Sequence, residues 1–249
     1  MPADKLTTKE NWKSHWTDRE IKYVKQDFSF SEIFKEISLE LDEGSSCVEL
    51  GGFPGYFSIF SLKYLKLKPT LIDFFFDHKY FQQVIRKNNL QAADVSVIEA
   101  DIFEHQPVTK YDFVFSIGLI EHFTDLKSII NVHKKYLSHN GKLLLIVPNF
   151  LGVNGIIQRI FDKPNLDLHN LNAMDINKII SLLDEAGFWV TKSGYYPSTQ
   201  IWIENIQQRN ILLRIFMRAA NHMMSLAGKL FGRKNRLLSN SIYWTARLK

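Results

Sequence analysis

Between residues 41 and 147 the chain alternates short apolar runs with stretches whose apolar residues recur at helical spacing. Each apolar run has the length of a buried strand. This alternation is typical of a parallel sheet with helices on both faces. The runs that predict strands are Cys47–Leu50, Thr70–Phe74, Val95–Glu99, Phe113–Ile117 and Leu143–Val147.

The stretches between these runs predict helices over Tyr56–Leu65, Lys79–Asn88 and Leu126–Leu137, the last ended by Asn140-Gly141. A sixth unit follows, in which Asp175 caps a helix that continues to Ala186 and stops at Gly187. The next strand is predicted over Phe188–Tyr195, and a seventh over Ser241–Ala246.

This pattern divides the chain into an N-terminal helical extension over 1–43 and a main domain over 44–249. Helical insertions interrupt the main domain at about 149–172 and 197–240, and we expect them to shape the substrate site. Aromatic residues gather in the extension, where they either form a lid over a ligand or simply pack against the domain. The residues concerned are Trp12, His15, Trp16 and Tyr23.

Apolar residues make up 45% of the 249 positions, enough for a large core and too many for a disordered chain. The single cysteine, Cys47, lies in an apolar run and offers neither a disulfide nor a zinc cluster. The first residues lack the apolar block of a secretory signal, and no apolar run has the length of a membrane span. We therefore expect a cytoplasmic protein.

The formal net charge of +5 is unevenly placed, because nine lysines and arginines and no acidic residue follow Glu204. Within this tail, 206–236 interleaves apolar and basic residues in an amphipathic helical pattern. Such a helix can lie on the inner membrane surface as a peripheral contact, offer arginines to a phosphate-bearing or lipid-linked acceptor, or pack as a cap or dimer surface. The pattern leaves these three roles and the oligomeric state open.

Polar residues follow successive predicted strands, at the edge where ligands bind in open parallel sheets. The first strand ends in Glu49 and a glycine turn, Gly51-Gly52-Phe53-Pro54-Gly55, which lets a ligand approach the backbone. The second ends at Asp73, 22 residues after Gly51, a spacing that suits a carboxylate binding a ribose diol.

The third strand leads into Asp101-Ile102-Phe103, where the carboxylate can accept from an adenine amino group and apolar neighbours can cover the ring. Phe74, directly after Asp73, can stack on the same ring or belong to the core. The fourth strand continues from Ser116 through Gly118 into Glu121-His122.

In this order the elements resemble the class I S-adenosylmethionine-dependent methyltransferase family over about residues 41–195. The resemblance implies a Rossmann-like seven-stranded sheet, six strands parallel and the last antiparallel, with S-adenosylmethionine at its carboxyl edge. It assigns Glu49, Gly51 and Gly55 to the donor-binding first motif, Asp73 to the ribose and Asp101 to adenine. Ser116 and Gly118 match the strand near the methionine part of the donor. Phe53 departs from the family pattern, because it stands where many members have glycine.

His122 and His169, the latter in the first insertion, are the candidate general bases if the acceptor is an alcohol. Each could instead bond only to nearby loop backbone. No metal is expected, because the Asp/Asp-Asn grouping of catechol-type methyltransferases is missing and Asn149 stands alone.

The insertion around 147–155 and 169–171 resembles bacterial methyltransferases of glycan and natural-product assembly, which suggests a hydroxyl of a sugar or related metabolite as acceptor. A nicotinamide-dependent oxidoreductase is the alternative, although the turn lacks the G-x-G-x-x-G order. A non-catalytic S-adenosylmethionine-binding module is another. A nucleic-acid acceptor is not expected, because the Asn/Asp-Pro-Pro-aromatic signature is missing after the fourth strand.

Overall fold

The computed structural model describes residues 5–17 and 19–249, in which one seven-stranded sheet runs in the order β3-β2-β1-β4-β5-β7-β6. The strands from β3 to β5 pair in parallel, and β7 pairs antiparallel with both β5 and β6. The α/β, Rossmann-like fold with six parallel strands and an antiparallel last strand is thereby confirmed. The strands are β1 (Ser46–Leu50), β2 (Lys68–Asp73), β3 (Ser96–Glu99), β4 (Tyr111–Ile117), β5 (Leu137–Pro148), β6 (Phe188–Tyr195) and β7 (Ser241–Leu248).

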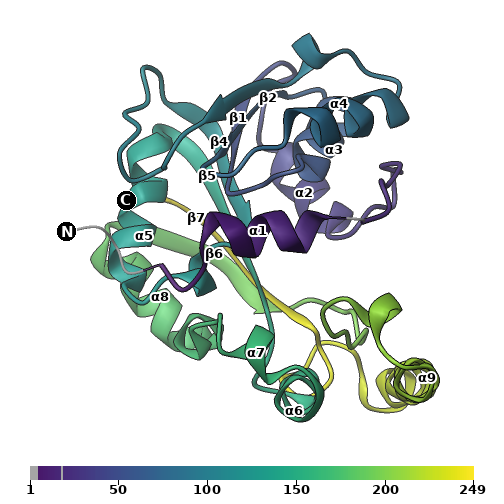
Figure 1. Ribbon diagram of the computed structural model, residues 1–249. Coiled ribbons are helices and arrows are strands. Elements are labelled where there is room, and N and C mark those ends of the chain that lie inside the picture. The colour runs from purple at the N-terminus through teal and green to yellow at the C-terminus, as the bar shows by residue number, and fades with distance from the viewer. Residues whose placement is uncertain (1–4, 18) are drawn as a thin grey trace.

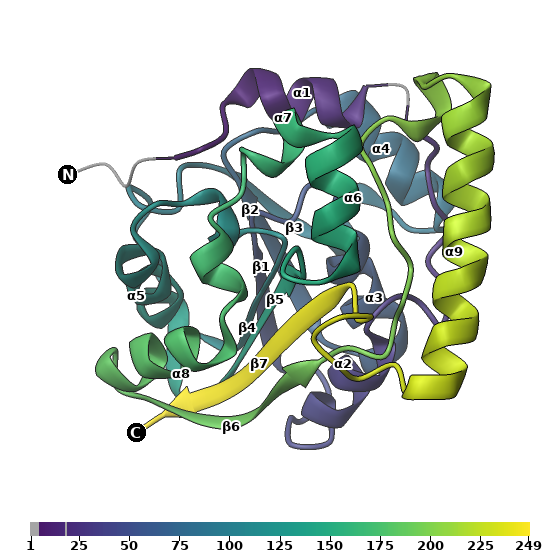
Figure 2. The same ribbon diagram turned by 90° about the horizontal axis from the view of Figure 1, so that it is seen from below.

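Helices cover both faces of this sheet, with α2, α3 and α4 on one side and α5 and α8 on the other (Figures 1 and 2). Further helices lie at its carboxyl edge and at the periphery. The α-helices are α1 (Lys9–Trp16), α2 (Ser31–Ser38), α3 (Tyr56–Leu65), α4 (His78–Lys87), α5 (Leu126–Tyr136), α6 (Val153–Phe161), α7 (Lys163–Leu166), α8 (Ile176–Glu185) and α9 (Ile211–Phe231). The short 3₁₀ segments are η1 (Ala92–Asp94), η2 (Ile120–His122), η3 (Leu171–Met174) and η4 (Ile206–Gln208).

The two layers follow from side-chain alternation along buried strands. In β4, Phe113 and Phe115 join the apolar cluster beneath α2, α3 and α4, whereas Val114 between them joins the cluster beneath α5 and α8. All three side chains are fully buried. This two-sided burial explains why the strands read as continuous apolar runs.

The cap expected for α8 is present, because the carboxylate of Asp175 accepts from the backbone N–H groups of Asn177 and Lys178. Gly187 follows with φ +85°, a left-handed conformation that favours glycine. In contrast, Asn140-Gly141 does not end α5. These two residues lie in the irregular first part of β5, where the register with β4 shifts.

The expected N-terminal extension does not behave as one unit. Helix α1 holds Trp12, His15 and Trp16 but ends before Tyr23, which is exposed. Helix α2 buries Phe34 in the sheet's own core, so it belongs to the main domain. Residues 1–4 and 18 of the extension lie outside the described residues.

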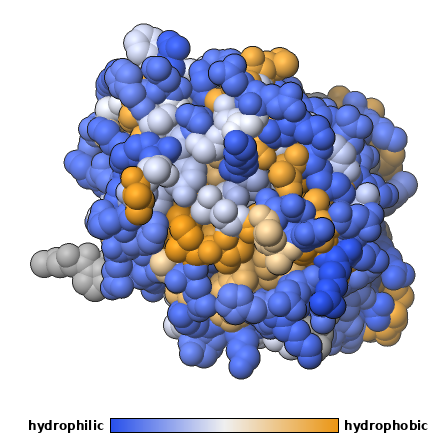
Figure 3. All heavy atoms as spheres, turned by 90° about the horizontal axis from the view of Figure 1, so that it is seen from above, coloured by the Kyte–Doolittle hydropathy of each residue, from blue (hydrophilic) through white to orange (hydrophobic). Residues whose placement is uncertain are grey.

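The two insertions carry α6 and α7 in the first and α9 in the second. They share a third, smaller apolar cluster that includes Ile157, Ile203 and Met217. Helix α9 runs along the edge of the molecule, outside the layers on the sheet (Figure 2). Among the described residues, no helix combines the length and apolarity needed to cross a membrane. Seen from the side opposite to Figure 2, the surface is mostly hydrophilic, and a band of apolar side chains crosses the lower half of the view (Figure 3).

Candidate functional site

The first site element is the turn after β1, where Glu49 folds back beneath the chain. Its Oε2 accepts from the backbone N–H of Ser58 at 2.9 Å and from the Ser58 hydroxyl at 2.6 Å. A Cβ at Gly52 would lie 2.1 Å from the Glu49 side chain, so only glycine leaves room for this carboxylate. Burial raises the pKa of Glu49 to about 8, although the bonds from Ser58 oppose that rise.

Asp73, at the end of β2, ties this turn to the neighbouring strand. Its carboxylate accepts from the backbone N–H of Phe53 at 2.9 Å and from that of Phe75 at 3.0 Å. Burial raises its pKa to about 6, against the lowering effect of these bonds. Each carboxylate oxygen can accept further hydrogen bonds, so the group can hold the turn and a ligand hydroxyl together.

Asp101 follows β3 and forms an ion pair with Lys5 from the N-terminal segment. The Lys5 ammonium also lies 4.7 Å from the centre of the Phe74 ring. These three residues border a cavity of about 30 Å³ together with Asp73 and Ile102. That volume holds about one or two water molecules, so the cavity is too small in this arrangement for an aromatic ring.

The end of β4 places its two candidate residues differently. Gly118, with φ +70°, lies at the wall of a larger pocket. Ser116 points to the opposite side, where its Oγ lies 2.9 Å from Nε2 of His133 on α5. The alternation of side chains along a strand therefore places the Ser116 hydroxyl in the layer beneath α5, away from the pocket.

The larger pocket has a volume of about 320 Å³ and lies at the carboxyl edge of the sheet. It is lined by α1, the turn after β1, the ends of β4 and β5, and the insertions. The predicted residues on it are Glu49, Gly51, Gly52, Phe53, Gly118, His122 and His169. Gly55 is not on its wall but begins α3 with φ +86°.

Glu121, His122 and His169 meet at one end of this pocket. His122 Nδ1 lies 2.9 Å from the carbonyl oxygen of Leu168, and His169 Nδ1 lies 2.7 Å from that of Asn165. A carbonyl oxygen only accepts, so both Nδ1 atoms carry the proton and both Nε2 atoms present lone pairs. Oε2 of Glu121 is buried and has no hydrogen-bond partner, which is true of few buried polar atoms among the described side chains.

Burial controls the ionisation of all three groups. It lowers the pKa of His122 to about 3 and that of His169 to about 4, so both rings are neutral near pH 7. It raises the pKa of Glu121 to about 8. Trp12 and Phe150 pack edge-on against the two imidazoles, with ring centroids 5.1 Å and 4.9 Å away.

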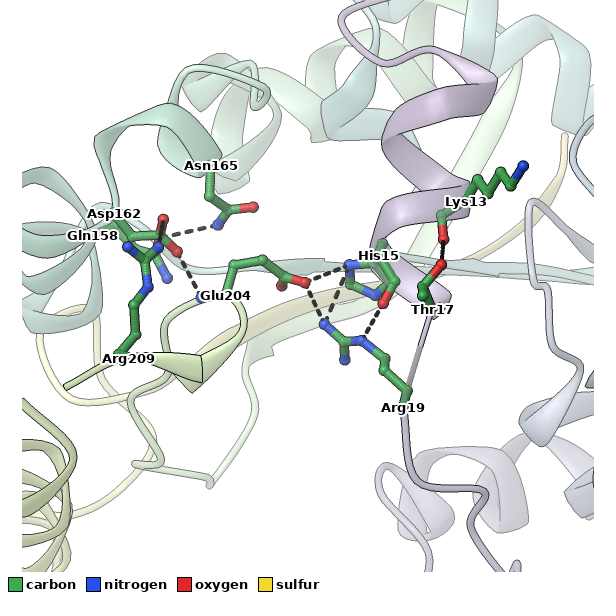
Figure 4. A network of polar contacts seen from close by, with 9 residues as sticks. All are labelled: Lys13, His15, Thr17, Arg19, Gln158, Asp162, Asn165, Glu204 and Arg209. Atoms are coloured by element: carbon green, nitrogen blue, oxygen red, sulfur yellow. Dashed lines mark hydrogen bonds and ion pairs between the residues drawn. The ribbon is translucent and has the colours of Figure 1, made fainter. Parts of the chain in front are cut away.

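Helix α1 crosses this edge of the sheet (Figure 1), and its side chains at Trp12, His15 and Trp16 line the pocket. The chain before it is held by its backbone, because Leu6 N–H donates to the carbonyl of His122 at 2.8 Å. The helix is held at its other end by Glu204 of the second insertion, whose carboxylate contacts His15 and Arg19 (Figure 4). The position of Glu204 is fixed by Asp162, which accepts from the Glu204 backbone N–H at 2.6 Å.

Three of these contributors were not assigned to the site from sequence. Glu121 was named only as part of the turn after β4, and Lys5 and Glu204 carried no signal, because an ion pair between distant segments leaves no periodic pattern.

Comparisons with known proteins identify the family of this domain. A family model described as a methyltransferase domain matches residues 21–193. Among curated proteins no match is found.

Solved structures resemble the fold at low sequence identity. Phosphoethanolamine N-methyltransferase 2 of Haemonchus contortus, in complex with S-adenosyl-L-methionine, has a TM-score of 0.63 at 12% identity, over 97% of this chain and 58% of that one. A SAM-dependent methyltransferase of Archaeoglobus fulgidus has a TM-score of 0.56 at 14% identity, over 86% of this chain and 91% of that one. The 1,6-didemethyltoxoflavin-N1-methyltransferase of Burkholderia thailandensis has a TM-score of 0.56 at 12% identity, over 96% of this chain and 83% of that one. Below 25% identity these likenesses concern the fold alone.

Proposed function

The chain belongs to the methyltransferase domain family, and on this premise we propose that it moves the methyl group of S-adenosylmethionine to a hydroxyl of a sugar or related small metabolite. As a member of this family it is an S-adenosylmethionine-dependent methyltransferase, and a nicotinamide-dependent oxidoreductase is set aside. The observation that supports a small acceptor is the pocket of about 320 Å³, which lies within the usual range for small-molecule sites.

We assign the donor to the edge of β1, β2 and β3. The backbone of the turn from Glu49 through Gly51, Gly52 and Phe53 to Gly55 lets a ligand approach closely. Asp73 accepts from the ribose hydroxyls, and Asp101 accepts from the adenine amino group once Lys5 has left it. Phe74 and Ile102 cover the ring.

Gly118 lines the larger pocket, and we assign it to the methionine part of the donor. Ser116 is left out of this assignment because its hydroxyl faces His133.

The reaction needs little more than orientation, because the sulfonium methyl is already electrophilic. The acceptor oxygen attacks the methyl carbon, the carbon–sulfur bond breaks, and its electron pair stays on sulfur. The hydroxyl proton passes to Nε2 of His122 or His169. Their low pKa values do not prevent this step, because an oxygen that has gained a methyl group is a far stronger acid than an imidazolium.

The exposed face of α9 supports a further proposal, that the enzyme works at an anionic lipid surface. Leu212, Leu230 and Phe231 are each more than 75% exposed, although α9 also has a buried face at Met217 and Met224. All charged residues after Glu204 are basic. An apolar face beside basic side chains suits the interface of an anionic bilayer, where a lipid-linked or phosphate-bearing acceptor would lie.

Calorimetry with S-adenosylhomocysteine and NAD tests the donor assignment. We expect S-adenosylhomocysteine to bind and NAD not to bind. Asp73→Asn should weaken binding at least about tenfold, because an amide group presents hydrogens where two hydroxyls and two backbone N–H groups need acceptors. Asp77→Asn is the matched control, because Asp77 only caps α4 and asparagine is an equally good cap. Binding of NAD alone would overturn the assignment.

A further inference from the structure

Three side chains that can each offer a lone pair to a metal ion converge in the pocket. One ring nitrogen each of His122 and His169 and a carboxylate oxygen of Glu121 lie within 4.8 Å of one another. Because both Nδ1 atoms bond to backbone carbonyls, Nε2 is the nitrogen that each imidazole can offer to a ligand. Among the described residues none of the three atoms has a hydrogen-bond partner, since the protons of both imidazoles are on Nδ1 and used by backbone carbonyls. When Glu121 is ionised, all three atoms are acceptors, and a cation between them removes their mutual repulsion.

We propose that Glu121, His122 and His169 bind a first-row transition-metal dication such as Zn²⁺. Two imidazole nitrogens and one carboxylate form a ligand set that is typical of open catalytic zinc and iron(II) sites, with positions left for an external oxygen. Mg²⁺ and Ca²⁺ prefer oxygen ligands and fit this set poorly.

The hydrogen bonds of the two imidazoles support a metal-binding role for this group. Metal-ligating histidines almost always donate their other N–H to a carbonyl or carboxylate, which fixes the tautomer and the ring. Both histidines do so here, to Leu168 and Asn165. Glu121 adds an independent observation, because its side chain lines the pocket, is only 1% exposed, and leaves Oε2 unpartnered.

The size of the group is compatible with one ion after a small adjustment. A tetrahedral ion with bonds of about 2.1 Å holds its ligand atoms about 3.4 Å apart. The three atoms, within 4.8 Å of one another, would therefore draw together by side-chain rotation. Sequence inspection did not predict this site, because His169 comes from the first insertion and the expectation of no metal rested on a different, oxygen-rich grouping.

The site rests on geometry alone, whereas its role rests on the proposed function. An ion held there would use the lone pairs that His122 and His169 otherwise offer as bases. An acceptor hydroxyl on an open position of the ion would be oriented by it and would lose its proton to water more readily.

Cobalt absorption tests the site without relying on activity. The protein is prepared without a polyhistidine tag, and a chelator removes any bound metal. It is then titrated with Co²⁺ while the visible absorption bands of bound cobalt are recorded. We expect one equivalent to bind and Zn²⁺ to displace it. Glu121→Gln, His122→Gln and His169→Gln should each weaken binding at least about 100-fold, since even the loss of residues that support a ligand costs 10- to 100-fold.

The matched controls are His139→Gln and His222→Gln, which remove exposed histidines and should leave the titration unchanged. Binding of S-adenosylhomocysteine by each variant shows that its fold is intact. Wild-type protein that binds S-adenosylhomocysteine but gives no saturable cobalt band would overturn the metal site and leave the proposed function standing. Cobalt binding that persists in all three ligand variants would overturn it as well. Conversely, a cobalt band without binding of the sulfur ligands would overturn only the proposed function.

Discussion

Nδ1 of His15 lies 3.1 Å from Oε1 of Glu204, so the first helix is fastened to the insertion that precedes the last strand. Arg19 reaches the same carboxylate (Figure 4). Helix α1 also lines the pocket, so we expect this contact to influence access to it.

Glu204→Gln should loosen α1 and lower kcat/KM about tenfold, because water then enters the pocket and the acceptor is held less firmly. Steady-state kinetics with a methyl acceptor measure the effect. Glu185→Gln is the control, since it removes an exposed ion pair with Lys127 on the far layer of the sheet. Equal rates in wild type and Glu204→Gln would show that the contact does not govern access.

The same carboxylate gives a pH dependence. Burial raises the pKa of Glu204, but the hydrogen bonds and charges of His15 and Arg19 together lower it by more. The resulting pKa is about 2, below the ordinary 4.5. A depressed folded-state pKa stabilises the fold above the unfolded value, and this stabilisation is lost as the pH falls from about 4.5 toward 2. The difference in unfolding free energy between wild type and Glu204→Gln should therefore shrink between pH 5 and pH 3. A difference that is constant over this range would contradict the assignment.

Lys5→Ala should bind S-adenosylhomocysteine severalfold more tightly than wild type. The reason is that Lys5 pairs with Asp101 in a cavity of about 30 Å³, so a donor bound there as we propose would have to break that pair. Calorimetry measures the change. Lys13→Ala, on the exposed side of α1, is expected to bind like wild type. Weaker binding by Lys5→Ala would instead mean that the lysine contacts the donor.

Alanine at His122 or His169 should lower turnover far more than it lowers donor affinity, because both side chains line the pocket that we assign to the acceptor. Turnover and S-adenosylhomocysteine affinity are measured on the same preparations. His139→Ala, which removes an exposed imidazole, serves as the comparison. If neither histidine variant loses turnover, the base role is wrong.

Leu230→Ser combined with Phe231→Ser should abolish co-sedimentation with vesicles rich in anionic lipid. Burying each of these side chains in the interface contributes about 1.5 to 3 kcal/mol, and both are 78% exposed in the free protein. Val108→Ser is the matched control, because Val108 is fully exposed in the loop between β3 and β4 and is not part of α9. Wild-type protein that stays in the supernatant with anionic vesicles would remove the lipid proposal.

Local sequence patterns were enough to predict the sheet, because the residues within and directly flanking each strand and helix specify that element. Phe188–Tyr195 and Tyr56–Leu65 have the predicted bounds, and Asp175 caps its helix as expected. The turn at Asn140-Gly141 was misplaced because an Asn-Gly pair marks a break in the backbone without saying which element it interrupts.

The site was predictable only in part. Strand ends brought Glu49, Asp73 and Gly118 to one edge, as the topology requires. Ser116 faces away, because a residue's side of the sheet depends on its register, which the motif alone does not specify. Glu121 lies close to His169, and Lys5 pairs with Asp101, because of the tertiary paths of the connecting loops. Local sequence preferences do not specify these paths.

The place of β7 between β5 and β6 also determines the order in which the molecule can form. Among the strands that the structure describes, β6 pairs only with β7, so one edge of the sheet stays incomplete until Ser241–Leu248 has been synthesised. During that interval β5 presents an unpaired edge, and α9 must already be looped out of the way. Pairings between segments so distant in sequence form slowly. We therefore expect the newly made chain to be most prone to aggregation just before β7 inserts, and chaperone dependence to be concentrated at this final step.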